Sequence, residues 1–189
     1  SVAPVYIGPI YVFRNTLINN WQDCFKLGEQ SRGRAYFYHN TCYARGSVQG
    51  IDRSGGDSNT AFYSNQIFRN NIVDVDRRGI AGGSPGNSYD YDNIFGSYAP
   101  ATWCPIQDDP SCSGGVEYFN FATFQTATGQ ELHGISIATQ NEYMDFANKD
   151  FKLKSGSQFI DKGVVIIGFN DQNSAQPYLG NAPDLGAFE

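Results

Sequence analysis

Three basic residues, Arg14, His39 and Arg69, stand at the same position of a short segment that recurs along the chain, and each directly precedes an asparagine. If the copies of this segment stack, the three basic groups form a column and repel one another unless an anion lies across them. The pattern therefore predicts a surface that binds an anionic ligand. The alternative is that the two arginines pair with acidic residues or cap strand ends.

Aromatic residues occupy the same segments. Because side chains alternate between the two faces of a strand, placing one set in the core leaves the other set pointing outward. The inward set is then Ile10, Val12, Leu17, Phe37, Cys42, Ile67 and Ile72, and the outward set is Tyr11, Phe13, Tyr36, Tyr38 and Phe68. Large exposed apolar surfaces often serve binding, so the outward column is a candidate platform for stacking sugar rings. A long loop such as residues 98–130 could instead cover it.

Four aspartates, Asp74, Asp76, Asp90 and Asp92, lie close to the third and fourth copies of the segment. Hard oxygen ligands on a rigid sheet suit Ca²⁺, so a calcium site is one expectation. Asx turns and surface ion pairs explain the same residues equally well. No other cofactor is indicated, because the sequence has neither a P-loop nor a dinucleotide-binding fingerprint.

The four cysteines include no CxxC pair, and the chain has two histidines, which disfavours a zinc site. Cys104 and Cys112 bracket a polar loop that folds back easily, which predicts a disulfide between them. A disulfide indicates an oxidising setting, either extracellular or at the cell surface. Cys42 takes an apolar position of the repeat, and whether it only fills the core or pairs with Cys24 stays open at this point.

The recurring segments are predicted to be short strands joined by tight bends. Residues 11–18, 36–43 and 66–73 read YVFRNTLI, YFYHNTCY and QIFRNNIV, and a weaker fourth copy covers 89–95. Each is rich in Tyr, Phe, Ile and Val and contains an asparagine, which tolerates the left-handed backbone of a bend. Asn15, Asn40 and Asn70 recur after 25 and 30 residues, a period that suits one rung of three strands. In stacked rungs their amides would form a ladder.

These segments, together with the end of the chain, resemble the right-handed parallel β-helix proteins of the pectate-lyase-like superfamily. The stretches Asp150-Phe151-Lys152-Leu153, Ile160-Asp161-Lys162-Gly163 and Asp184-Leu185-Gly186-Ala187-Phe188-Glu189 are similar to the D-F-x-L…I-D-x-G…D-I-G-A-x-E ending of many secreted members. The resemblance covers most of residues 10–97 and 150–189, as the C-terminal portion of such a protein. It implies an all-β fold, a right-handed parallel β-helix or β-solenoid with an irregular C-terminal cap.

One domain is expected, in three parts. Residues 1–97 form rungs of the parallel β-helix, residues 98–130 form a loop insertion that carries the disulfide, and residues 131–189 supply the final rungs and the cap.

The resemblance further implies a secreted module that interacts with an acidic polysaccharide. In uronate lyases a basic residue removes the proton beside a carboxylate that cations neutralise, and Arg14, His39 and Arg69 are the candidates for such roles here. No motif matches one lyase family residue by residue, and the superfamily also holds non-enzymatic proteins. Whether the chain cleaves its ligand therefore stays open.

Two non-enzymatic functions compete with this one. Residues 1–78 carry nine basic and six acidic side chains, whereas residues 79–189 carry four and thirteen. This polarity favours copies that stack head to tail in an extracellular filament. The other possibility is a glycan-binding adhesin. A net charge of −6 argues against a nucleic-acid partner, and no apolar run approaches the ~20 residues of a membrane-spanning helix.

Overall fold

The computed structural model describes the chain except for residues 1–7, 19–22, 27–33, 53–64, 108–111 and 189. The described residues form mostly short strands, with one helix. The first strands are grouped in rungs, a rung being three successive strands. The first rung has β1 (Ile10–Phe13), β2 (Thr16–Ile18) and β3 (Phe25–Lys26), and the second has β4 (Ala35–Tyr38), β5 (Thr41–Ala44) and β6 (Ile51–Asp52). The third has β7 (Gln66–Arg69), β8 (Ile72–Val75) and β9 (Arg78–Gly83), and the fourth has β10 (Ser88–Asp90), β11 (Asn93–Gly96) and β12 (Ala99–Trp103).

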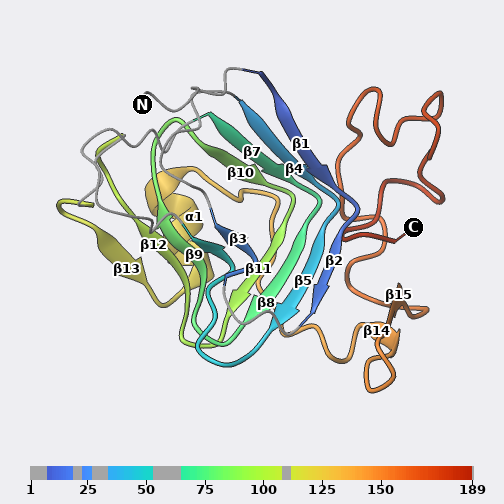
Figure 1. Cartoon of the computed structure of the whole chain (residues 1–189), viewed down its shortest axis with the longest axis horizontal. Helices are drawn as coiled ribbons and strands as arrows, with labels where there is room; N and C mark the ends of the chain where they lie inside the picture. The colour runs from blue at the N-terminus through green and yellow to red at the C-terminus, as the bar shows by residue number, and fades with distance from the viewer. Residues whose placement is uncertain (1–7, 19–22, 27–33, 53–64, 108–111, 189) are drawn as a thin grey trace, which may run out of the picture.

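Each rung lies on the one before it, so that three parallel sheets surround a common interior (Figure 1). The first sheet has the order β1-β4-β7-β10, the second β2-β5-β8-β11, and the third β3-β6-β9-β12. The third sheet is extended by the antiparallel β13 (Val116–Tyr118). The fourth rung ends at Trp103, so part of the segment 98–130 is a strand of the third sheet and not the expected loop insertion.

A ladder of side chains marks the corner between the first and second sheets. Asn15 Nδ2 donates to Asn40 Oδ1 at 2.9 Å, Asn40 Nδ2 to Asn71 Oδ1 at 2.9 Å, and Asn71 Nδ2 to Asp92 Oδ1 at 2.8 Å. The expected ladder is thus present, but its third member is Asn71 and not Asn70. The sequence Arg-Asn-Asn offers two asparagines there, and the first of them does not lie in register.

The residue before each ladder position has a left-handed backbone. Arg14, His39, Asn70 and Tyr91 have φ of 52°, 52°, 60° and 59°, a region that residues other than glycine adopt rarely. Arg69 therefore does not continue the column of Arg14 and His39, as its position before an asparagine predicted. It lies one residue earlier, opposite Tyr38 in the register of the first sheet.

The interior between the three sheets is filled mainly by aromatic and branched side chains. Phe68 is fully buried, stacked between Phe37 at 4.3 Å and Tyr89 at 5.0 Å, measured between ring centroids. The expectation that Phe68 points outward is wrong, because Phe68 pairs with Phe37 while Ile67 pairs with the outward Tyr36. The same one-residue shift that moves the ladder to Asn71 exchanges the two faces of β7.

The far end of the fourth rung is covered. Helix α1 (Phe121–Thr128) begins after the N-cap Asn120, whose side chain accepts from the Thr123 amide, and it buries Phe124 completely. The residues after the helix bond to the outer edges of β10 and β11. The Tyr89 amide donates to the Gln130 side chain, and the Ile94 amide donates to the Ile135 carbonyl. Residues 120–135 therefore form the cap at this end.

The sequence predicted that the rest of the chain caps the last rung. It packs instead outside the second sheet. The hairpin β14 (Tyr143–Asp145) and β15 (Asp150–Leu153) and the segments after it run back towards the first rung (Figure 1). A second hydrophobic cluster joins this C-terminal run to the strands, made of Tyr43, Ile72, Tyr143, Phe151, Phe159 and Leu185. The Gly186 amide then donates to the Asn70 carbonyl, which places the end of the chain at the corner beside the ladder.

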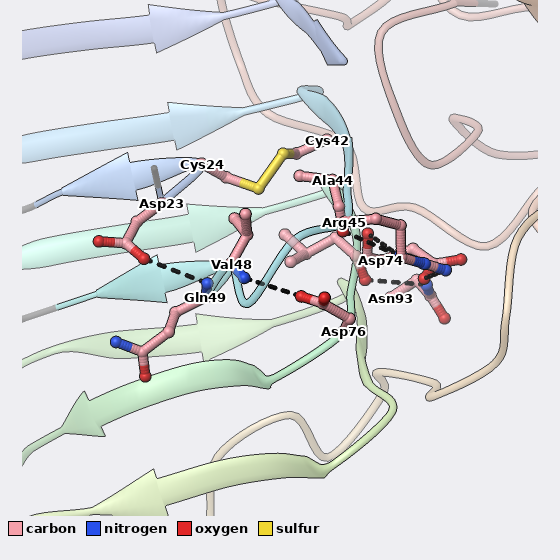
Figure 2. Close-up of a disulfide and its surroundings, with 11 residues drawn as sticks. Asp23, Cys24, Cys42, Ala44, Arg45, Val48, Gln49, Asp74, Asp76 and Asn93 are labelled. Carbon is pink, nitrogen blue, oxygen red and sulfur yellow. Dashed lines mark hydrogen bonds and ion pairs between the residues drawn. A yellow bond between two sulfur atoms is a disulfide. The ribbon is translucent and has the colours of Figure 1, made fainter. Parts of the chain in front are cut away.

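Two disulfides tie the described chain together. Cys24–Cys42 links the residue just before β3 in the first rung to β5 in the second, and Cys104–Cys112 closes the loop after β12. Figure 2 shows the first of them beside the corner at which Asp76 accepts hydrogen bonds from the turn after β5. Cys42 is both a core residue and a disulfide partner.

Removing Cys24–Cys42 by a double change to alanine is expected to lower the free energy of unfolding by about 3 kcal/mol, because the disulfide restricts the unfolded chain. The matched control is Cys104→Ala with Cys112→Ala, which opens a loop of 8 residues where the first opens one of 18. Urea denaturation of both variants measures the difference. A loss for the first variant that is no larger than for the control would contradict this explanation, because the longer loop should restrict the unfolded chain more.

No helix in the described part of the chain is both long and apolar enough to cross a membrane.

Candidate functional site

A pocket of about 280 Å³ lies where the C-terminal run meets the ends of β1 and β4, at the corner between the first and second sheets. It is lined by Phe13, Arg14, Tyr38, His39, Gly168, Phe169, Ala175 and Gln176. Four of these eight are candidates from the sequence, two from the basic column and two from the aromatic one. The other four come from a segment more than a hundred residues further along the chain.

Aromatic rings form one side of this pocket. Tyr11 and Tyr36 stack at 4.9 Å on the outer face of the first sheet, and Phe169 packs against Phe13 at 5.7 Å and against Tyr38 at 5.1 Å. Tyr11 and Phe13 remain about half exposed, at 48% and 49%, whereas Tyr38 is buried. The outward aromatic column thus exists, without Phe68. The segment that partly covers it is the one around Phe169, and not the described part of residues 98–130.

Arg14 supplies the positive charge of the pocket. One guanidinium nitrogen donates to the Gln176 carbonyl at 3.3 Å, and no acidic side chain in the described part of the chain forms an ion pair with Arg14. A guanidinium has five N–H donors in a planar fork that matches carboxylate and sulfate groups. Arg14 therefore has donors left for an anionic ligand.

Arg69 lies on the same face but outside the lining of the pocket. Its guanidinium donates to the Phe68 and Ser88 carbonyls and, at 2.6 Å, to the Ser88 hydroxyl. Arg69 still influences Tyr38, which lines the pocket, through its charge. Burial raises the pKa of Tyr38 to about 12, and the charges of Arg69 and Arg34 oppose that rise. Arg69 and Arg34 therefore bring positive charge close to Tyr38.

His39 is buried beneath the pocket with both ring nitrogens in contact with other groups. Nε2 lies 3.0 Å from Asn70 Nδ2 and 2.7 Å from Asn170 Nδ2, and Nδ1 lies 3.3 Å from the Gly186 carbonyl oxygen. Burial, and then the charge of Arg14, lower the pKa of His39 to about 4. The imidazole is therefore neutral near pH 7, and its lone pair already accepts from two amides.

The four aspartates considered as calcium ligands do not come together, and each has partners of its own. Asp74 pairs with Arg45 at 2.7 Å (Figure 2). It also accepts from the Thr139 amide and hydroxyl. Asp76 accepts three backbone N–H groups of residues 46–48, which lower its pKa although burial opposes the shift. Asp90 binds the exposed His133, and Asp92 ends the ladder. No group of three or more His, Cys, Asp or Glu side chains that could hold a metal occurs among the described residues.

Asp92 meets a second buried carboxyl group, Glu131, and no sequence pattern indicates this pairing. Glu131 Oε2 accepts the Asp92 amide, and both side chains are fully buried. Asp92 Oδ2 and Glu131 Oε1 have no hydrogen-bond partner in the described structure. Burial raises the pKa of Asp92 to about 7, and burial with the neighbouring Asp92 charge raises the pKa of Glu131 well above its usual value. The raised pKa values favour a proton on this pair near pH 7, and a protonated carboxyl group can donate a hydrogen bond.

The residues that sequence analysis missed are those of the C-terminal run. Phe169 and Asn170 follow Gly168, which has φ of 84°, so a glycine followed by an aromatic residue and an amide is the local sign of a bend. Nothing local indicates that this bend packs on β1 and β4. Comparison of the chain with protein-family models, with curated proteins and with solved structures gave no match.

Proposed function

We propose that this chain is a right-handed parallel β-helix that acts outside the cell, where it binds an acidic polysaccharide without cleaving it. The three parallel sheets, which take one strand from each rung, support the fold, as do the segments that resemble pectate-lyase-like proteins. The two disulfides support an oxidising, extracellular setting. No metal or other cofactor is part of the proposal.

The observation that carries the binding function is the combination of Arg14 with aromatic rings in one pocket. Arg14 has no acidic partner in the described chain and borders the pocket together with Phe13, Tyr38 and Phe169. An acidic sugar offers the two features that such a pocket recognises, an apolar ring face and a carboxylate or sulfate. The exposed Tyr11 extends the aromatic surface along the sheet for neighbouring sugar units.

Binding without cleavage is supported by the state of two of the three basic candidates, His39 and Arg69. A lyase base needs a lone pair directed at the ligand, and the His39 lone pair faces Asn70 and Asn170. Arg69 is engaged with Ser88 and lies outside the pocket lining. Neither is placed to remove a proton from a sugar bound beside Arg14.

End-to-end stacking of copies has less support. At the end formed by the fourth rung, β10 and β11 bond to residues 130–135, and β12 bonds to β13. A strand edge serves as a template for another chain only while its N–H and C=O groups are free. In the described part of the chain, this end therefore offers a second copy the outer edge of the short β13 in place of the edges of β10, β11 and β12.

Arg14→Ala is expected to weaken binding to immobilised pectin, alginate or dextran sulfate by at least about tenfold, the loss of one charge-assisted contact. Affinity electrophoresis or biolayer interferometry measures the change, and circular dichroism checks that the strands are retained.

The matched control is Arg69→Ala, which removes the same charge from the same face but not from the pocket. Its binding is expected to fall much less, through long-range attraction alone. Equal losses for the two variants, or an unchanged affinity for Arg14→Ala, would argue against the pocket. A rise in ultraviolet absorbance from unsaturated uronates during incubation would contradict binding without cleavage.

A further inference from the structure

One side of the pocket is held in place by a buried set of polar side chains. The Gly168–Phe169 bend, which we call the wall, is followed by Asn170, and Asn170 is fully buried against His39. Asn70, also fully buried, holds Val164 ahead of the wall through both ends of its amide. His39 is the residue that both amides share.

The orientation of each amide is fixed by bonds to the backbone. Asn70 Oδ1 accepts the Val164 amide and Asn70 Nδ2 donates to the Val164 carbonyl, both at 2.8 Å. Asn170 Oδ1 accepts the Ile166 amide at 2.6 Å, and its Nδ2 donates to the Val164 carbonyl at 3.2 Å. Turning either amide around would break these bonds, so both side chains must present N–H groups to His39 Nε2. The proton of the neutral ring is therefore on Nδ1, facing the Gly186 carbonyl.

We infer that His39 is a positioning residue: its neutral imidazole, as an acceptor for Asn70 and Asn170, holds the wall against the pocket, and protonation of the ring releases it. A protonated ring presents an N–H at Nε2 to two amide donors that cannot turn. A buried clash of three donors costs more than the bonds it replaces. The wall then separates from Phe13 and Tyr38, and the pocket loses its closed side.

The groups that face the imidazole agree with this role. From the corner of the first rung, Arg14 disfavours a charged ring, and from the C-terminal run the backbone carbonyls of Gly186 and Asp184 favour one. Burial is the largest influence and opposes the charge, so that the pKa of His39 falls to about 4. Release is therefore expected in mildly acidic conditions, below the pH at which the free side chain titrates.

The test measures hydrogen–deuterium exchange of peptides covering residues 164–176, in the whole protein without ligand, from about pH 7 to about pH 3, against an unstructured reference peptide at each pH. Normalised exchange in the native chain is expected to rise at least tenfold as the pH falls through about 4. His39→Gln keeps an acceptor that does not titrate, and its wall is expected to stay protected throughout. His39→Leu removes the acceptor, and its wall is expected to exchange rapidly at every pH.

A purely structural role would affect the two variants alike, so rescue by glutamine separates the alternatives. Exchange that is flat with pH in the native chain, or a protected wall in His39→Leu, would overturn the inference.

Binding gives the second readout and rests on the function proposed above. Dextran sulfate is the probe, because its sulfate esters stay ionised across this pH range, and its retention is expected to fall at least tenfold together with wall release. If no polysaccharide binds at pH 7, the proposed function fails while the exchange result still decides the role of His39. If the wall opens and retention does not change, the wall is no part of the binding site.

Discussion

Phe68→Ala should cost about 4 kcal/mol in the free energy of unfolding, because it removes a whole aromatic ring from a packed interior. Phe68 is completely buried, and its ring is stacked on both Phe37 and Tyr89, so neighbouring rungs cannot close the cavity without losing their own contacts. The adjacent Ile67 lies on the outer face, opposite Tyr36, and is only partly buried. Ile67→Ala should therefore cost about 1 kcal/mol.

Urea denaturation followed by tryptophan fluorescence measures both changes, since Trp103 lies in the same core. The pair is informative because the sequence repeat predicts the opposite faces for these two residues. A larger loss for Ile67→Ala than for Phe68→Ala would mean that the register of β7 is shifted by one residue, and with it the position of Arg69 relative to the pocket.

Raising the pH from 5 to 9 should destabilise the fold through the carboxyl pair at the end of the ladder. The folded-state pKa of Asp92 is raised to about 7, and that of Glu131 is raised well above its usual value, so the folded chain holds protons that the unfolded chain has released. The stability that these protons confer is complete below the unfolded pKa values near 4 and is lost as the pH rises through the folded values. The slope reaches about 1.4 kcal/mol per pH unit for each excess proton.

Glu131→Gln should reduce this loss. A glutamine carbonyl can accept the Asp92 amide as Glu131 Oε2 does, and its NH₂ group can donate to the orphan Asp92 Oδ2 without a bound proton. The variant should therefore be more stable than the native chain above about pH 8 and have a flatter dependence of stability on pH. Thermal unfolding across this pH range measures both. A native protein whose stability does not decline with rising pH, or a variant with the same decline, would contradict a shared proton in the pair.

The repeats YVFRNTLI and YFYHNTCY are enough to predict the first two strands of each of the first two rungs, because alternation and the asparagine agree on one register. Their strands, the outward Tyr11, Phe13, Tyr36 and Tyr38, and the Asn15–Asn40 contact all follow from it. In the third copy the two cues separate, because Arg-Asn-Asn contains two residues suited to the ladder. Only pairing with the neighbouring rung, through Thr41 opposite Ile72, selects Asn71.

The packing of the C-terminal run could not be predicted from the sequence either, because it depends on contacts between distant parts of the chain. Its bends are recognisable from glycines and amides, but the surface on which they pack is decided by contacts such as Thr139 with Asp74 and Phe169 with Tyr38, which join distant parts of the chain. The pocket exists only because the C-terminal run packs back on the first sheet, and so do the environments of His39 and Asn70. Sequence analysis could therefore find the half of the site that lies on the sheet and not its wall.

The most direct test of the proposed function observes Arg14 while a ligand binds. In ¹H–¹⁵N spectra of the labelled protein titrated with a pectin-derived oligogalacturonide, the Arg14 Nε–H signal and the Phe169 amide should shift saturably with one affinity. The Arg69 Nε–H signal should hardly move, because Arg69 remains bonded to Ser88. Shifts confined to other surfaces, or no shift at Arg14 when the oligosaccharide binds, would contradict an acidic-glycan site in this pocket.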